Sequence, residues 1–202
     1  MSGARRVRTR TMRHLQKGFT LVETMIAAAV LTVGILSLAA VLADAIAYMS
    51  VSEDDYIAQQ KASEAVESIF TARDQGQATW STICNVGSAI CSNGIFLTGS
   101  MPLCNPNTDG IIGTQDDFNG TACAGGLTNT DSILVPNASG NFNPPVQHPL
   151  STFSRTIVIS NVVDGSGNPI ANLREIQVTI TYTSGRFKNR TYTLTSYISN
   201  FS

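Results

Sequence analysis

Charged side chains are scarce in this chain of 202 residues, where Asp, Glu, Lys and Arg together make up 13%. The twenty residues from Thr24 to Ala43 contain none. A helix of this length spans about 30 Å, which is the hydrocarbon thickness of a bilayer. The sequence therefore predicts one membrane-spanning helix. Glu23 immediately precedes this segment, and because a carboxylate left in lipid costs roughly 2.5–3.5 kcal/mol, we expect Glu23 to need a partner.

Acidic side chains are absent from Met1 to Lys17, a segment that contains six of the thirteen basic ones. Acids cluster beyond the apolar segment, at Glu53, Asp54 and Asp55. Because positive charge is retained on the cytoplasmic side of a membrane span, we predict a cytoplasmic N-terminus and an exported remainder. The alternative is an ordinary secretory signal peptide, cleaved after the apolar segment at the small residues within 39–43.

The residues between the basic and the apolar segments carry a short motif. The string from Gly18 to Glu23 reads Gly-Phe-Thr-Leu-Val-Glu and resembles the class III signal of type IV prepilins and type II secretion pseudopilins. The resemblance implies that a prepilin peptidase cleaves after Gly18 and that Phe19 becomes the N-methylated N-terminus. It also implies that Glu23 meets a terminal amine during subunit docking. An ammonium and a carboxylate that leave water together neutralise each other, whereas either alone is expensive to bury.

Proline is absent from Leu38 to Val41, where the mature helix of major pilins commonly has one. The segment from Leu31 to Ala39, with Gly34 inside it, resembles the helix of PilV-type minor pilins. The resemblance implies a minor pilin that helps initiate or cap a type IV pilus. The implied partners are prepilin peptidase, other major and minor pilins, and the pilus assembly platform in the inner membrane. The implied location is the inner membrane before assembly, and the pilus, in the periplasm and at the cell surface, after assembly.

Two other functions remain open at this point. A tip-located adhesin would use its exported loops as a binding module, and a minor pseudopilin would serve a type II secretion system.

Glycine and proline are absent from Ser50 to Asp74, where apolar residues recur every three or four positions. This spacing predicts an amphipathic helix. We predict one continuous helix from about residue 19 to residue 73, because nothing in the sequence interrupts it. A membrane helix followed by a separate amphipathic helix is the alternative. After Gln75-Gly76 the chain is rich in Gly, Asn, Ser and Thr, which indicates loops up to residue 149.

Polar and apolar residues alternate in Leu173–Thr183 and again in Arg186–Ser199, which is the period of a half-buried strand. Ser184-Gly185 between them predicts a tight hairpin, and Phe153–Val163 is a third predicted strand. Shorter strands are predicted at Ile95–Thr98 and Ser132–Pro136.

The predicted fold class is α+β. A long N-terminal helix, with a transmembrane half and an amphipathic half, packs on a C-terminal antiparallel β-sheet, which is the architecture of type IV pilins. The predicted parts are a leader at 1–18 removed by prepilin peptidase, the transmembrane half at 19–49, the amphipathic half at 50–74, and an exported head at 75–202.

All four cysteines, Cys84, Cys91, Cys104 and Cys123, lie in the predicted exported loops. An even number in an oxidising compartment indicates two disulfides. Three pairings are possible, and we favour Cys84 with Cys91 and Cys104 with Cys123, because sequential closure staples each loop locally. The longer loop would gain roughly 3 kcal/mol on the chain-entropy model. Zinc is the weaker alternative, since the paired CxxC spacing of common structural sites is absent.

The twelve residues from Asn105 to Asp116 have the spacing of a calcium-binding loop. Oxygen ligands stand at positions one, three, five and twelve, and a glycine stands at position six, as calcium loops require. The candidate ligands are Asn105, Asn107, Asp109 and Asp116. Asn replaces the usual first Asp, and Asp replaces the usual last Glu. An ordinary Asn-, Asp- and Gly-rich turn is the alternative.

Catalytic motifs are also lacking, since no GxSxG, HExxH or P-loop pattern occurs, and we therefore predict that the protein is not an enzyme. Without residues 1–18 the chain keeps seven Lys or Arg against fourteen Asp or Glu, a formal charge of −7. This balance predicts no nucleic-acid partner. Arg186, Lys188 and Arg190 are predicted to form a solvated strand edge, with contact to DNA or to an acidic neighbour as the alternative.

Overall fold

The computed structural model describes residues 18–185 and 187–200. The predicted leader therefore lies outside the described residues except for Gly18, and Arg186 lies outside them as well. The described chain forms two compact units, one up to Ile46 and the other from Ala47 onward.

Helix α1 runs without interruption from Leu21 to Asp74. The prediction of one continuous helix is therefore confirmed. At its start the Thr20 hydroxyl accepts a hydrogen bond from the Glu23 amide at 3.3 Å, as N-cap residues do. At its end Gly76 adopts a φ of 73°, a left-handed conformation that glycine reaches without steric cost and that commonly ends helices.

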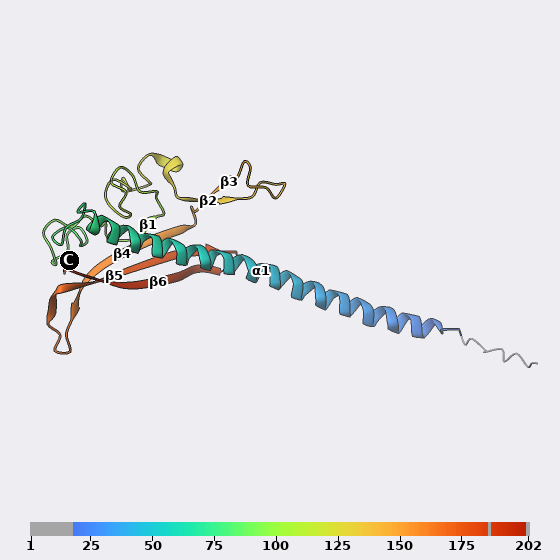
Figure 1. Ribbon diagram of the computed structural model, residues 1–202. Helices are drawn as coiled ribbons and strands as arrows, with labels where there is room; N and C mark the ends of the chain where they lie inside the picture. Colours follow the sequence, from blue (N-terminus) through green and yellow to red (C-terminus); the bar gives the residue numbers. More distant parts are fainter. Residues whose placement is uncertain (1–17, 186, 201–202) are drawn as a thin grey trace, which may run out of the picture. The chain divides into compact units, whose positions relative to one another are not determined.

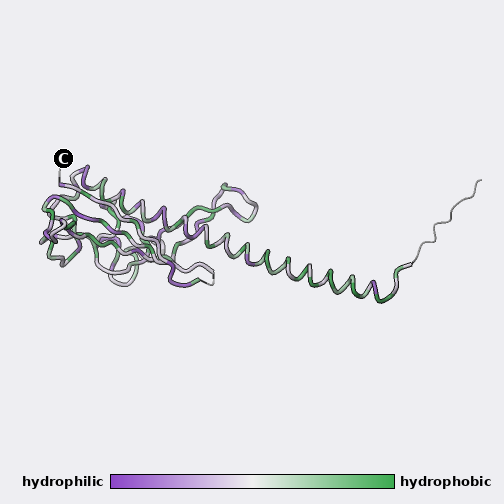
Figure 2. Tube along the Cα trace, turned by 90° about the horizontal axis from the view of Figure 1, so that it is seen from below, coloured by the Kyte–Doolittle hydropathy of each residue, from purple (hydrophilic) through white to green (hydrophobic). Residues whose placement is uncertain are grey.

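The first unit consists of the apolar part of α1. Every described residue before Ala45 is exposed, and Figure 2 shows hydrophobic colouring along this part of the helix. By length and composition, α1 contains a segment that can cross a membrane. A helix that is apolar all round belongs in lipid or among other helices.

The second unit contains an antiparallel sheet in the order β1-β4-β5-β6 and a separate hairpin of β2 and β3 (Figure 1). A short 3₁₀ helix covers Gly126–Asn129. The strands are β1 (Met101–Pro102), β2 (Ser132–Val135), β3 (Val146–Pro149), β4 (Phe153–Val163), β5 (Pro169–Ser184) and β6 (Phe187–Ser199).

The three long strands and β2 confirm the predictions, and the remaining differences are local. β5 begins at Pro169, earlier than predicted, because the Asp164 carboxylate accepts hydrogen bonds from two backbone amides, of Ser166 and Asn168, and holds a tight turn. The predicted strand at Ile95–Thr98 is wrong, since Phe96 forms only isolated bridges there. β1 and β3 are short segments that the alternation did not indicate.

The core lies between the second half of α1 and the inner face of β4, β5 and β6 (Figure 1). Four alanines of α1 are almost fully buried, and their small side chains let the helix backbone approach the sheet closely. Residues of the predicted loops also belong to this core, so the loops contribute to its packing. The main core residues are Ile57, Ala58, Ala62, Ala65, Ile69, Ala72, Phe96, Leu103, Ile111, Ile112, Ile157, Ile176, Val178, Ile180 and Ile198.

Asp55 connects α1 to the β5–β6 hairpin. Its carboxylate accepts hydrogen bonds from Arg190 Nε at 3.1 Å and Nη2 at 2.9 Å, and also from the Tyr182 hydroxyl. Burial, followed by the contact with Asp55, raises the pKa of Tyr182. β6 is an edge strand, as predicted, and the Arg190 side chain is still 37% exposed. Its pairing with Asp55 matches the acidic neighbour that the sequence left open as the alternative.

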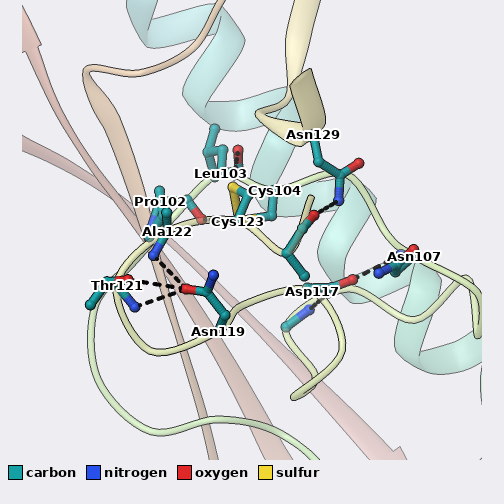
Figure 3. Close-up of a disulfide and its surroundings, with 12 residues drawn as sticks. Pro102, Leu103, Cys104, Asn107, Asp117, Asn119, Thr121, Ala122, Cys123 and Asn129 are labelled. Atoms are coloured by element: carbon teal, nitrogen blue, oxygen red, sulfur yellow. Dashed lines mark hydrogen bonds between the residues drawn. A yellow bond between two sulfur atoms is a disulfide. The ribbon is translucent and has the colours of Figure 1, made fainter. Parts of the chain in front are cut away.

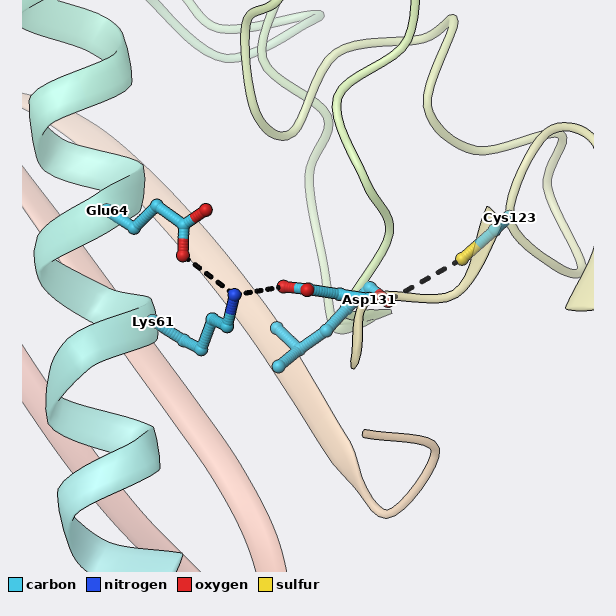
Figure 4. Close-up of polar contacts among 5 residues, drawn as sticks. Lys61, Glu64, Cys123 and Asp131 are labelled. Atoms are coloured by element: carbon cyan, nitrogen blue, oxygen red, sulfur yellow. Dashed lines mark hydrogen bonds and ion pairs between the residues drawn. The ribbon is translucent and has the colours of Figure 1, made fainter. Parts of the chain in front are cut away.

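Lys61 is a buried cation on the core side of α1. Its ammonium lies 2.8 Å from Glu64 and 2.7 Å from Asp131, which directly precedes β2 (Figure 4). Burial alone would lower the pKa of Lys61, but the hydrogen bonds and charges of Asp131 and Glu64 outweigh it and raise the pKa. Asp131 also donates its amide to the Leu103 carbonyl at 2.9 Å. The ion pair therefore fastens the loop region to the helix.

We expect Asp131→Asn to lower the free energy of unfolding by about 3–5 kcal/mol, because removing one partner leaves a poorly compensated buried charge. Urea unfolding of the oxidised protein in mild detergent, followed by the fluorescence of Trp80, measures the change. Asp74→Asn is the matched control, since it breaks an exposed pair with Arg73 and should cost less than about 1 kcal/mol. The double variant Lys61→Met with Asp131→Leu should recover most of the loss. Equal effects at positions 131 and 74 would contradict this account.

Candidate functional site

The predicted processing site lies at the start of α1. Gly18 and Phe19 are exposed and precede the helix, and a side chain added at Gly18 would meet no atom within 4 Å. The peptide bond between them therefore lies outside the helix. A peptidase can reach its carbonyl, because this carbonyl is not enclosed in a helical turn.

Glu23 is the acidic residue in the first turn of α1. It is exposed, and among the described residues no ion pair or hydrogen bond of its carboxylate is found. The helix macrodipole favours an acidic side chain at this position. In an apolar environment the carboxylate would still need an external cation, because the neighbouring turns of α1 carry none.

The polar side chains within the apolar segment satisfy their own hydrogen-bonding needs. The hydroxyls of Thr24, Thr32 and Ser37 each donate to a carbonyl three residues earlier, at 2.8 Å. Backbone-bonded hydroxyls of this kind can enter lipid without an unpaired donor. Gly34 leaves a gap on the helix surface, and small residues at such places allow a second helix to approach closely.

The comparisons with known proteins agree with this geometry. Residues 13–39 match the family model described as the prokaryotic N-terminal methylation motif. This match supports a type IV pilin-like prepilin. The matched region, together with the apolar helix, fits a membrane-anchored pilin. Neither the curated proteins nor the solved structures gave a match.

Two disulfides join Cys84 to Cys91 and Cys104 to Cys123, which is the pairing favoured from the sequence. Figure 3 shows the second of them beside Pro102 and Leu103. Cys84, Cys104 and Cys123 are buried, so the bridges lie at the margin of the core. With all four sulfurs in disulfides, no thiolate is left for the zinc alternative.

The predicted calcium loop brings only some of its candidate ligands together. Carboxylate oxygens of Asp109, Asp116 and Asp117 lie within 4.8 Å of one another. Asn107 is close by, but its side-chain amide donates to the backbone carbonyl of Asp116 at 3.0 Å. The backbone amide of Asn105 donates to the backbone carbonyl of Asn129 at 2.9 Å.

Asp117 is the acid of this cluster that the loop pattern missed, although its adjacency to Asp116 was a signal. It is buried, and its carboxylate accepts backbone hydrogen bonds from Asn107 at 2.9 Å (Figure 3) and from Gly113 at 2.8 Å. Burial raises the pKa of Asp117, while the backbone hydrogen bonds oppose that shift. A divalent cation would favour its charged form. The three acids suit calcium, which prefers oxygen ligands. The backbone amides of Asn107 and Gly113 also hold the Asp117 carboxylate in place without a metal.

Calcium binding is tested by its effect on thermal stability. If the three carboxylates hold calcium, millimolar calcium should raise the melting temperature of the protein, because a ligand that binds only the folded state stabilises it. Asp109→Ala should abolish the calcium-dependent increase, whereas Asp164→Ala, in the exposed turn after β4, should preserve it. A calorimetric scan that calcium leaves unchanged would remove the metal hypothesis.

Proposed function

We propose that the protein is a minor pilin that helps initiate or cap a type IV pilus and that it acts through assembly instead of catalysis. The observation that carries the proposal is the methylation motif at residues 13–39, which overlaps the apolar part of α1, where every described residue before Ala45 is exposed. The absence of proline from residues 38–41 favours a minor over a major subunit.

The proposed sequence of events begins in the inner membrane, with the N-terminus in the cytoplasm. Prepilin peptidase cleaves after Gly18, and the new terminus at Phe19 is methylated. The apolar helix then packs against the helices of other major and minor pilins, and the assembly platform moves the subunit into the pilus. No cofactor and no nucleic acid takes part.

Glu23 has the central role in this proposal. Lateral packing of helices removes water from the first turns of α1, so an unpaired carboxylate there becomes costly. An amine at the terminus of a neighbouring subunit offsets this cost. If the two helices pack in a shifted register, the amine no longer lies beside Glu23 and the cost returns. The pair would therefore select the register between subunits, as buried polar groups do in coiled coils.

Processing is tested by the intact mass of the full chain expressed with and without a prepilin peptidase. We expect the peptidase to remove residues 1–18 and the product to carry one additional methyl group. Gly18→Leu should leave the mass of the precursor unchanged, and Gly34→Leu, a matched change within the helix, should still be processed. An unchanged wild-type mass, or cleavage beyond the apolar segment, would refute the proposal.

Docking is tested by exchanging the carboxylate of Glu23 for an amide. We expect Glu23→Gln to be processed normally but to enter sheared filaments at least about tenfold less, because a charge-assisted pair is lost. Glu53→Gln is the control, since Glu53 is an exposed acid on the same helix. Equal incorporation of both variants, measured by immunoblot of purified filaments, would count against a docking role.

A tip adhesin is the second candidate function. A cavity lined by Trp80, Asn161 and Arg174 favours adhesion as an activity added to assembly. Deleting residues 84–123 cannot separate the two, because it would remove Phe96, Leu103 and Ile111 from the core. A strain that lacks the whole protein can do so. Loss of pili supports an assembly subunit, whereas normal piliation with lost attachment supports a pure adhesin.

A further inference from the structure

A cavity of about 590 Å³ lies between the loop after α1 and the β4–β5 hairpin. This size is typical of sites for small molecules. One wall is the loop closed by the Cys84–Cys91 disulfide, and the other comes from the strands. Its lining residues include Trp80, Ser81, Ser92, Asn161 and Arg174.

Arg174 is the charged residue of this cavity. It is 4% exposed, and its Nη1 donates to the carbonyls of Trp80 at 2.5 Å and Ile83 at 2.6 Å. The guanidinium carbon lies 4.1 Å from the centre of the Trp80 ring, which is a cation–π arrangement. Its Nε has no hydrogen-bond partner.

No acidic side chain in residues 18–185 and 187–200 forms an ion pair with Arg174. The other two buried cations, Lys61 and Arg155, have acids near them, although the Nε of Arg155 also lacks a partner. Lys61 contacts Glu64 and Asp131, and the charges of Asp131, Asp117 and Glu64 act on Arg155. For Arg174, burial lowers the pKa of the guanidinium and no acid opposes the shift. A buried cation without an anion is costly, so this position would gain from an external anion.

A structural role accounts for only part of this arrangement. The two carbonyls that Arg174 binds belong to the turn at residues 79–83, so the side chain holds that turn against β5. This role occupies Nη1 and leaves the charge without a counter-ion, while Nε is enclosed by protein atoms and has no acceptor. An amide side chain could donate to these carbonyls without burying a charge.

The remaining lining is uncharged and combines polar residues with the apolar Ile90, Cys91, Pro169 and Ala171. The polar lining residues are Thr79, Ser81, Ser92 and Asn161, beside Trp80, and the hydroxyls of Thr79 and Ser81 also hydrogen-bond to each other at 2.9 Å. Hydroxyl and amide groups next to an aromatic ring suit a molecule that carries several hydroxyls on an apolar ring. One guanidinium with no opposing acid selects a carboxylate on that molecule.

We propose that this cavity binds a carboxylate-bearing sugar, with Arg174 receiving the carboxylate and the Asn161 amide a ring hydroxyl. The site belongs to the exported head, so it does not depend on cleavage after Gly18 or on the position of the subunit in a filament. A surface polysaccharide with uronic acids is the class of partner that follows.

The test uses the oxidised full chain in detergent micelles and the fluorescence of Trp80, the single tryptophan of the chain. Glucuronate should give a saturable change, and glucose and acetate should bind at least about tenfold more weakly, since each lacks half of the recognised groups. Isothermal titration calorimetry provides a second measurement of the same affinities.

Variants link the response to the cavity. Arg174→Gln should abolish glucuronate binding and Asn161→Ala should weaken it several-fold, with circular dichroism as the check on folding. Lys188→Gln removes an exposed positive charge on β6 and should bind as the wild type does. If Arg174→Gln does not fold, Asn161→Ala and Ser92→Ala decide. No saturable response, equal affinity for glucuronate and either control ligand, or unchanged binding by these cavity variants would overturn the proposal.

Discussion

The organisation of the protein depends on one helix that meets two different environments. In its first half α1 exposes apolar side chains on all sides, which only lipid or other helices can cover. In its second half the same helix has one buried stripe, rich in alanine, against the sheet. Because Gly and Pro are absent from Ser50 to Asp74, the backbone continues through the change in side chains. A subunit that needs partners for half of its helix is suited to assembly.

The buried stripe of α1 packs against more than the three long strands. Residues from the long connection between α1 and β4, such as Phe96 and Leu103, complete the core. Irregular backbone contributes few ladder hydrogen bonds, so two disulfides and the Lys61–Asp131 pair hold it in place. The disulfides persist on unfolding and therefore reduce the entropy that the long connection gains.

Ion pairs also connect separate elements of the head. Asp55 binds Arg190, and Asp131 binds Lys61, so each pair joins the helix or a loop to another element. Arg174 stands apart, because its partners are carbonyls and a tryptophan ring. Glu23 also has no cation in the described chain. For these two groups we propose external partners, a sugar carboxylate for Arg174 and a terminal amine for Glu23.

The sequence by itself determined the features that depend on local patterns. The uncharged run after Glu23, the alternation in β5 and β6, and the order of the cysteines predicted the helix, the sheet and the disulfide pairing, because periodicity and chain distance act between near neighbours. Only the tertiary structure decided what Arg190, Asp117 and Arg174 contact. Their partners are Asp55, the amides around Gly113, and the turn at Trp80. Alternation assigns a residue to a face of a strand, but the element that packs on that face comes from a distant part of the chain.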